Sequence, residues 1–199
     1  MLLSSLQLSV LEEFLGDYKG SFTGRYIARK KSLNQKSVAN TLNRLENEGV
    51  LKSTTVGRNK QFSLNLGDLE TVKNLILAAE HLRTASFLKK NPLIKEVFAK
   101  TRPFFHGIVV VFGSYAKGTQ KKDSDLDVFV AGTYDRNRVS GVSELYNLQI
   151  SVKNYPSGAF RRALKNRDIL LNEILKSHFI IEGAEEFVNA VLRDYYGQD

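Results

Sequence analysis

In the first third of the chain, the spacing of hydrophobic residues is first that of helices and then that of strands. Apolar residues first recur at the spacing of one helix face and later at every second position, as on one face of a strand. Asn34 is placed to cap the longest of these helices, and Gly49 is placed to end it. The pattern predicts helices within residues 6–18, 25–32 and 33–51, followed by strands at 50–56 and 60–66.

The remainder of the chain begins with a long amphipathic stripe and continues with apolar runs typical of buried strands. Residues 68–90 have one apolar face, so we expect a helix that links two domains or forms a dimer seam. Asn91 and Pro92 end it. The expected strands are 107–112, 124–132, 148–154 and 178–183. This organisation predicts three parts, at residues 1–67, 68–91 and 92–199.

Composition is that of a globular protein. Hydrophobic residues make up 42% of the sequence, which is enough for a packed core. The sequence contains no run of about 18 apolar residues that could cross a membrane. It has no signal-peptide pattern at its start and no cysteine for a disulfide or a thiolate metal site. We therefore expect a cytoplasmic protein without a membrane segment.

The net charge of +8 is unevenly distributed along the chain. Residues 1–67 contain ten Lys or Arg and five Asp or Glu, whereas residues 104–199 contain twelve of each. Excess positive charge in the first half is expected of a region that binds a polyanion. A basic, solvated surface without a partner would give the same count.

The stretch GSYAKGTQKKDSDLD, residues 113–127, carries the candidate chemistry. Gly113 permits a sharp turn and the close approach of a ligand, and Ser114 offers a hydroxyl and nearby backbone N–H groups to a phosphate. Asp125 and Asp127 lie two positions apart on an expected strand, so both side chains project to the same side. Two such carboxylates repel each other unless a cation neutralises them, and Mg²⁺ prefers oxygen ligands.

This stretch resembles the signature of the DNA polymerase β-like nucleotidyltransferase superfamily, and most closely its minimal prokaryotic members. The resemblance implies an α/β fold of the α+β kind, with a mixed sheet packed with helices. It also implies Mg²⁺-dependent (or Mn²⁺-dependent) transfer of a nucleoside monophosphate from an NTP. Asp125 and Asp127 would hold the metal as the catalytic pair, whereas Gly113, Ser114 and Lys117 would bind the nucleotide.

The sequence departs from this family at one position. Active members have a third acid on a later strand, and the natural alignment places Ser151 there. A serine hydroxyl supplies neither the negative charge nor a strong base. Either another residue substitutes, or turnover is slow, or the domain binds nucleotide without transferring it.

Residues 5–66 resemble winged-helix DNA-binding domains of prokaryotic regulators, through element order alone. In such domains the third helix enters the major groove and the hairpin contacts the backbone. The residues that would contact DNA by position are Gln35, Lys36, Ser37, Asn40, Thr41 and Arg44 on the helix, and Arg58 and Lys60 on the hairpin. A small helical domain for protein contact or dimerisation is the alternative.

Three functions are compatible with this pairing of domains. One is a nucleotidyltransferase that modifies an acceptor, such as the HEPN-type proteins that minimal nucleotidyltransferases adenylylate as antitoxins. Another is a transcriptional regulator whose degenerate transferase domain senses nucleotide. The third is an enzyme that adds nucleotides to nucleic-acid ends.

Overall fold

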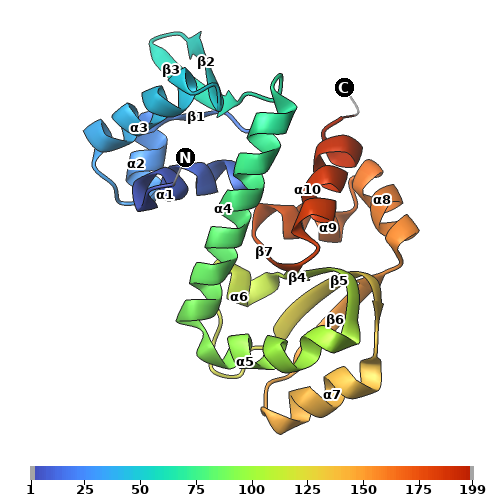
Figure 1. The fold of residues 1–199 in the computed structure, drawn as a ribbon. Coiled ribbons are helices and arrows are strands. Elements are labelled where there is room, and N and C mark those ends of the chain that lie inside the picture. The colour runs from blue at the N-terminus through green and yellow to red at the C-terminus, as the bar shows by residue number, and fades with distance from the viewer. Residues whose placement is uncertain (1–2, 198–199) are drawn as a thin grey trace. The chain divides into compact units, whose positions relative to one another are not determined.

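The computed structural model describes residues 3–197, and internal contacts divide the chain into two units, Met1–Ala79 and Glu80–Asp199 (Figure 1). The longest helix, α4 (Leu69–Lys90), runs across this division. Its bounds agree with the helix predicted at residues 68–90. Each unit has its own sheet.

The N-terminal unit contains three helices and a three-stranded antiparallel sheet of order β1-β3-β2. Its elements are α1 (Ser5–Leu15), β1 (Phe22–Thr23), α2 (Gly24–Lys30), α3 (Gln35–Asn47), β2 (Leu51–Val56) and β3 (Asn59–Leu64). The predicted order of helices and strands is confirmed. The sequence pattern missed β1, because a two-residue strand is too short to show an alternating period.

Local capping explains where these helices begin. Ser4, Thr23 and Asn34 each accept a hydrogen bond from a backbone N–H in the first turn of α1, α2 and α3. The inward-facing side chains of the three helices then pack into one core, in which Val10, Phe14, Ile27, Leu42 and Leu45 are completely buried.

The C-terminal unit is built on a mixed four-stranded sheet of order β6-β5-β4-β7. Its strands are β4 (Phe105–Val111), β5 (Leu126–Tyr134), β6 (Ile150–Tyr155) and β7 (Phe179–Glu182). Strand β4 is antiparallel to β5 and β7, whereas β6 is parallel to β5. The helices are α5 (Pro92–Thr101), α6 (Gly113–Lys117), α7 (Arg136–Leu145), α8 (Ser157–Lys165), α9 (Ile169–Lys176) and α10 (Ala184–Ala190). The predicted fold class is confirmed.

The two faces of this sheet have different coverings (Figure 1). Leu126, Val128 and Val130 point to one face and share a core with residues of α5 and α7. Phe129 points to the other face, where its ring contacts Phe160 of α8 at a centroid distance of 5.8 Å. Because side chains alternate along β5, Asp127 lies on this second face.

A buried ionic cluster connects α4 to the segment before β7. Glu80 is completely buried and accepts a hydrogen bond from Arg83 Nη2 at 2.7 Å, and its Oε1 lies 3.2 Å from His178 Nε2. His178 is 1% exposed, and its Nδ1 donates to the Ile174 carbonyl oxygen at 2.9 Å. Burial alone would raise the pKa of Glu80, but the charges of Arg83 and His178 together with their hydrogen bonds hold it below its ordinary value.

Candidate active site

The turn after β4 is fitted to the start of β5. Gly113 has φ +68°, a left-handed conformation that favours glycine, and a Cβ there would collide with the carboxylate of Asp127. The Phe112 N–H also donates to the Asp127 carbonyl oxygen at 3.0 Å. The missing Cβ therefore allows the Gly113–Ser114 turn to lie directly against Asp127.

The two predicted carboxylates are brought together, although Asp125 lies just before β5 and not within it. Asp125 is exposed and Asp127 is partly buried. Burial raises the pKa of Asp127 above its ordinary value, and the negative charge of Asp125 raises it further. Like charges held this way fit a hard divalent cation whose remaining ligands come from phosphate oxygens and water.

Ser151 is aligned with Asp127. In the parallel pair of β5 and β6, Asp127 is opposite Ser151, so the two side chains project to the same face. Ser151 therefore lies on the sheet face that carries Asp127, and its equivalence to the family's third acid stays a prediction. Glu144 does not replace the missing acid, because it lies on α7, which packs on the opposite face of the sheet. Within residues 3–197 no cluster of three His, Cys, Asp or Glu side chains is placed to hold a metal ion.

Lys153 is a charged neighbour of Asp127 that the sequence analysis did not select. It lies two residues after Ser151 on β6, hence on the same face of the sheet. Its positive charge lowers the pKa of Asp127, partly offsetting burial and Asp125. The alternation of β6 would have placed Lys153 beside the site once the register with β5 was known.

Helix α9 contributes a further acid that the sequence analysis missed. Glu173 forms an ion pair with Lys117 Nζ at 2.6 Å, and its negative charge also raises the pKa of Asp127. The Ser177 hydroxyl donates to the Ala116 carbonyl oxygen at 2.9 Å, which joins the end of α9 to α6. Lys117 and Glu173 line an open pocket of about 460 Å³. The predicted nucleotide-binding residue Lys117 therefore lies near the carboxylates but is paired with an acid.

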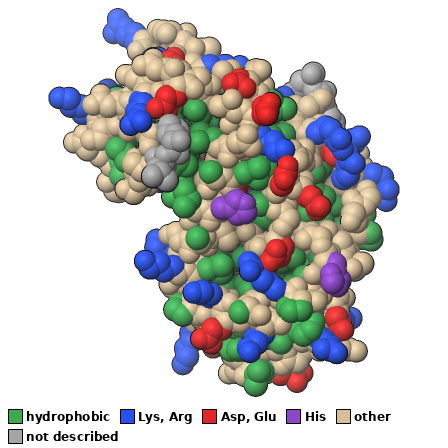
Figure 2. All heavy atoms as spheres, in the orientation of Figure 1, with side chains coloured by type: hydrophobic (Ala, Val, Ile, Leu, Met, Phe, Trp, Pro, Cys, Tyr) green, Lys and Arg blue, Asp and Glu red, His purple; other side chains and the backbone are tan. Residues whose placement is uncertain are grey.

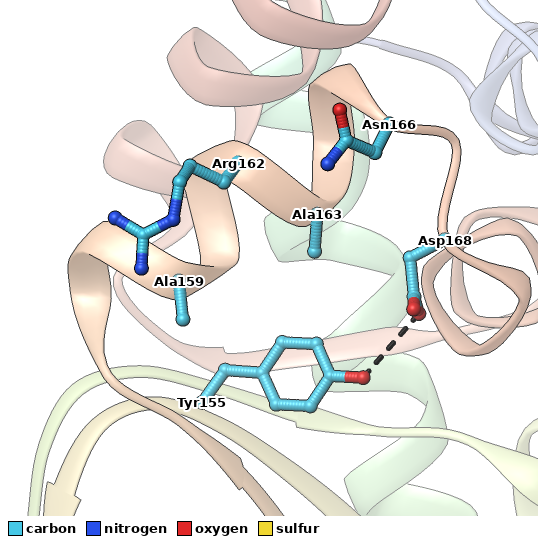
Figure 3. A pocket seen from close by; sticks show the side chains of 6 residues that line it. All are labelled: Tyr155, Ala159, Arg162, Ala163, Asn166 and Asp168. Carbon is cyan, nitrogen blue, oxygen red and sulfur yellow. Dashed lines mark hydrogen bonds between the residues drawn. The ribbon is translucent and has the colours of Figure 1, made fainter.

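A second open pocket, of about 400 Å³, follows the same face of β6 toward its end. The Tyr155 hydroxyl points to Asp168 and donates to Oδ1 at 3.4 Å (Figure 3). Burial and the charge of Asp168 raise the pKa of Tyr155. Asp168 also caps α9 by accepting from the Leu170 and Leu171 N–H groups, so its carboxylate already has a structural role in this pocket.

Most of the residues expected to contact DNA are on the surface of α3 and the β2–β3 hairpin. Those that are exposed are Gln35, Lys36, Asn40, Arg44, Arg58 and Lys60, and Ser37 is partly exposed. The prediction for Thr41 is wrong: it is only 8% exposed, and its hydroxyl donates to the Ser37 carbonyl oxygen at 2.9 Å. The helix turns Thr41 toward the core beside Leu42, where a backbone carbonyl satisfies the hydroxyl.

The cations of this surface differ in how far their charge is already neutralised. Lys60 donates to Glu46 at 2.6 Å, and this bond lowers the pKa of Glu46. Arg44 pairs with Glu48 at 2.9 Å. Among the described residues, none forms an ion pair with Arg58. Basic side chains of this unit are separated by acidic ones on the displayed face, without one continuous basic patch (Figure 2).

Comparison with known protein families bears on the C-terminal unit. Residues 89–187, just under half of the chain, match the family model of the nucleotidyltransferase domain. The match supports transfer of a nucleoside monophosphate as its general class of activity. It spans Gly113, Ser114, Asp125 and Asp127 but not α1–α3.

Two further comparisons gave nothing to add to that match. Neither the curated proteins nor the solved structures contain a significant match to this chain.

Among the described residues, no helix has both the length and the hydrophobicity that a membrane crossing requires.

Proposed function

We propose that this protein is a metal-dependent nucleotidyltransferase whose nucleotide site is formed by Gly113, Ser114, Asp125 and Asp127. The observation that carries the proposal is the packing of a glycine turn against a mutually repelling pair of carboxylates, inside a region that matches the nucleotidyltransferase family. Asp125 and Asp127 would hold Mg²⁺ or Mn²⁺ as a resident cofactor. The bound ion would neutralise negative charge on the phosphates.

The chain's own residues would bind and orient the triphosphate. Ser114 offers its hydroxyl to a phosphate oxygen, and the bare Gly113 backbone lets the phosphates approach Asp127 closely. In the reaction an acceptor hydroxyl oxygen bonds to the α-phosphorus while the bond between that phosphorus and the bridging oxygen breaks. Pyrophosphate leaves, and the hydroxyl proton passes to water because Ser151 is not a base.

The proposal also covers the acceptor of the nucleotide and the role of the N-terminal unit. A hydroxyl on a partner protein is the acceptor we favour, with a HEPN-type protein as the partner implied by the minimal nucleotidyltransferase signature. The N-terminal unit would act as a winged helix that binds DNA through Gln35, Lys36, Asn40, Arg44 and Arg58. A three-helix unit followed by a hairpin supports this role. Self-association through α4 would make the protein a homodimer.

A nucleotide-sensing regulator is the second candidate function, and Ser151 favours it. Ser151 is opposite Asp127 in the parallel pair of β5 and β6, and the family resemblance implies an acid at this position in members that transfer. General-base help is typically worth about 10²–10⁴-fold in rate, so its absence would leave a site that binds nucleotide and turns over little or not at all. The N-terminal unit would then change its affinity for DNA when nucleotide is bound.

One experiment separates the two functions. The protein is incubated with labelled ATP, CTP, GTP or UTP and Mg²⁺ or Mn²⁺, with and without candidate protein and nucleic-acid acceptors. Label on an acceptor that disappears in Asp125→Asn/Asp127→Asn establishes the transferase. Saturable nucleotide binding without transfer establishes the sensor, and no binding of any of the four nucleotides contradicts both.

A further inference from the structure

Strand β6 presents a cation beside the place where the third acid is missing. Ser151 and Lys153 are two residues apart on β6, and the register with β5 puts both on the face that carries Asp127. Among the cations that lower the pKa of Asp127, Lys153 acts more strongly than Lys117. The serine at the expected acid position and the lysine at residue 153 therefore lie on one strand face.

Lys153 differs from Lys117 in what already binds it. Lys117 is held by Glu173 at 2.6 Å, so the charges of this pair offset each other. Lys153 is exposed, and its ammonium group forms neither a hydrogen bond nor an ion pair with any residue between 3 and 197. Its ammonium group therefore has its three donors available to a ligand bound against Asp127.

The charges around Asp127 suit one divalent cation better than two. Asp125 and Asp127 contribute two negative charges and Lys153 one positive charge, whereas Lys117 and Glu173 cancel. The sum is −1, which one divalent cation converts to +1, a favourable potential for a triphosphate. A second divalent cation would bring the sum to +3 with no third carboxylate on the strand to bind it.

We propose that Lys153 is a nucleotide-binding residue that contacts the triphosphate in place of a second metal ion. The site then binds an NTP with a single divalent cation, held by Asp125 and Asp127. Lysine suits this role because its ammonium is a compact point charge on a flexible stem and a common phosphate ligand. The inference rests on the proposed nucleotide site but not on whether the site transfers or only senses nucleotide.

The test is nucleotide binding and metal stoichiometry. Calorimetry with ATP, CTP, GTP and UTP in Mg²⁺ compares wild type with Lys153→Ala, Lys153→Arg and Lys95→Ala. Lys95 is a matched control because it is an exposed lysine on α5, which packs on the opposite face of the sheet. We expect Lys153→Ala to weaken binding roughly 10- to 100-fold, the range for a lost charge-assisted contact. Lys153→Arg should restore most of the affinity, and Lys95→Ala should have no effect.

Metal stoichiometry gives an independent readout. Electron paramagnetic resonance of Mn²⁺ should detect one bound ion per bound nucleotide in wild type and two in Ser151→Asp, where the third carboxylate is restored. Circular dichroism checks that each variant is folded.

The outcomes separate this inference from the proposed function. Unchanged affinity in Lys153→Ala, with binding lost in Asp125→Asn/Asp127→Asn, would overturn the role of Lys153 and leave the nucleotide site standing. Two Mn²⁺ ions per nucleotide in wild type would do the same. A wild-type protein that binds none of the four nucleotides would overturn the nucleotide site and this inference with it.

Discussion

Two carboxylates of the C-terminal unit differ in burial, and their pKa values shift in opposite directions. Glu80 is completely buried, yet its pKa is lowered because Arg83 and His178 interact with it. Asp127 is only partly buried, yet its pKa is raised because burial is reinforced by the charge of Asp125. The direction of the pKa shift is therefore decided by the neighbouring charges and not by the depth of burial.

The contrast separates a structural acid from a candidate ligand-binding acid. The charge of Glu80 is compensated inside the protein, so it has no need of a ligand. The charge of Asp127 is incompletely compensated and lies beside a glycine turn. A cation that binds there removes the repulsion between Asp127 and Asp125, so its binding is strongly favourable.

Removing the compensated acid should have the largest effect. Glu80→Ala leaves Arg83 and His178 without their shared partner in a buried position. Breaking one partner of a buried ionic cluster costs roughly 3–5 kcal/mol of unfolding free energy. Chemical denaturation followed by far-UV circular dichroism measures this, since the chain has no tryptophan. Glu96→Ala, an exposed acid on α5, is the control and should change stability little. Equal stability of the two variants would remove the structural role assigned to Glu80.

Removing the uncompensated acids should abolish function without unfolding the protein. Asp125→Asn/Asp127→Asn eliminates both charged ligands, so metal-dependent nucleotide binding should fall by roughly 100-fold or more. The unfolding free energy should stay the same or rise slightly, because the repulsion between the carboxylates disappears. Calorimetry measures the loss of nucleotide binding, and chemical denaturation measures the unfolding free energy. A double variant that binds nucleotide and metal like wild type would discard the site.

The two acids should also affect the pH dependence of stability with opposite sign. The pKa of Glu80 is lowered on folding, so its contribution is complete above its unfolded value of about 4.3 and is lost as the pH falls through its folded value. The pKa of Asp127 is raised on folding, so its ionisation costs stability at neutral pH, and that cost fades as the pH falls toward about 3.9.

Denaturation curves between pH 3 and pH 7 therefore distinguish the acids. The stability difference between wild type and Glu80→Ala should shrink toward the acidic end. Asp127→Asn should be the more stable protein at neutral pH and should lose this advantage on acidification. Parallel curves for all three proteins would contradict the opposite assignments.

The same contrast between compensated and uncompensated charge applies to the N-terminal unit, with a smaller expected effect. Arg44 is paired with Glu48, whereas none of the described residues forms an ion pair with Arg58. If both contact phosphates, Arg44→Ala/Arg58→Ala should weaken DNA binding and reduce the salt slope by about 2. Fluorescence anisotropy at several salt concentrations measures the slope. Arg58→Ala should account for more of the loss than Arg44→Ala, because Arg44 must first leave Glu48. A wild-type affinity that does not change with salt would count against DNA binding.

Sequence reasoning succeeded where one local rule decided the outcome. The period of the apolar residues identified α1, α3, α4 and the β2–β3 hairpin, and Asn34 caps α3 as predicted. Strand alternation put Asp127 and Leu126 on opposite faces, as observed, whereas Asp125 lies just before β5 and outside the strand. It failed for Thr41, because a polar residue at the border of a helical stripe can face either way until the neighbouring core is known.

The chain's own order of residues determined the candidate chemistry, namely a glycine-serine turn, two carboxylates at strand spacing and a serine where a third acid is expected. These features follow from backbone periodicity, which acts over a few residues and can be read locally. Only the tertiary structure decided what surrounds Asp127: Lys153 through the register of β5 with β6, and Glu173 through the packing of α9 against α6. Electrostatic interaction depends on distance in space, and residues 127, 153 and 173 become neighbours only when the sheet and its helices assemble.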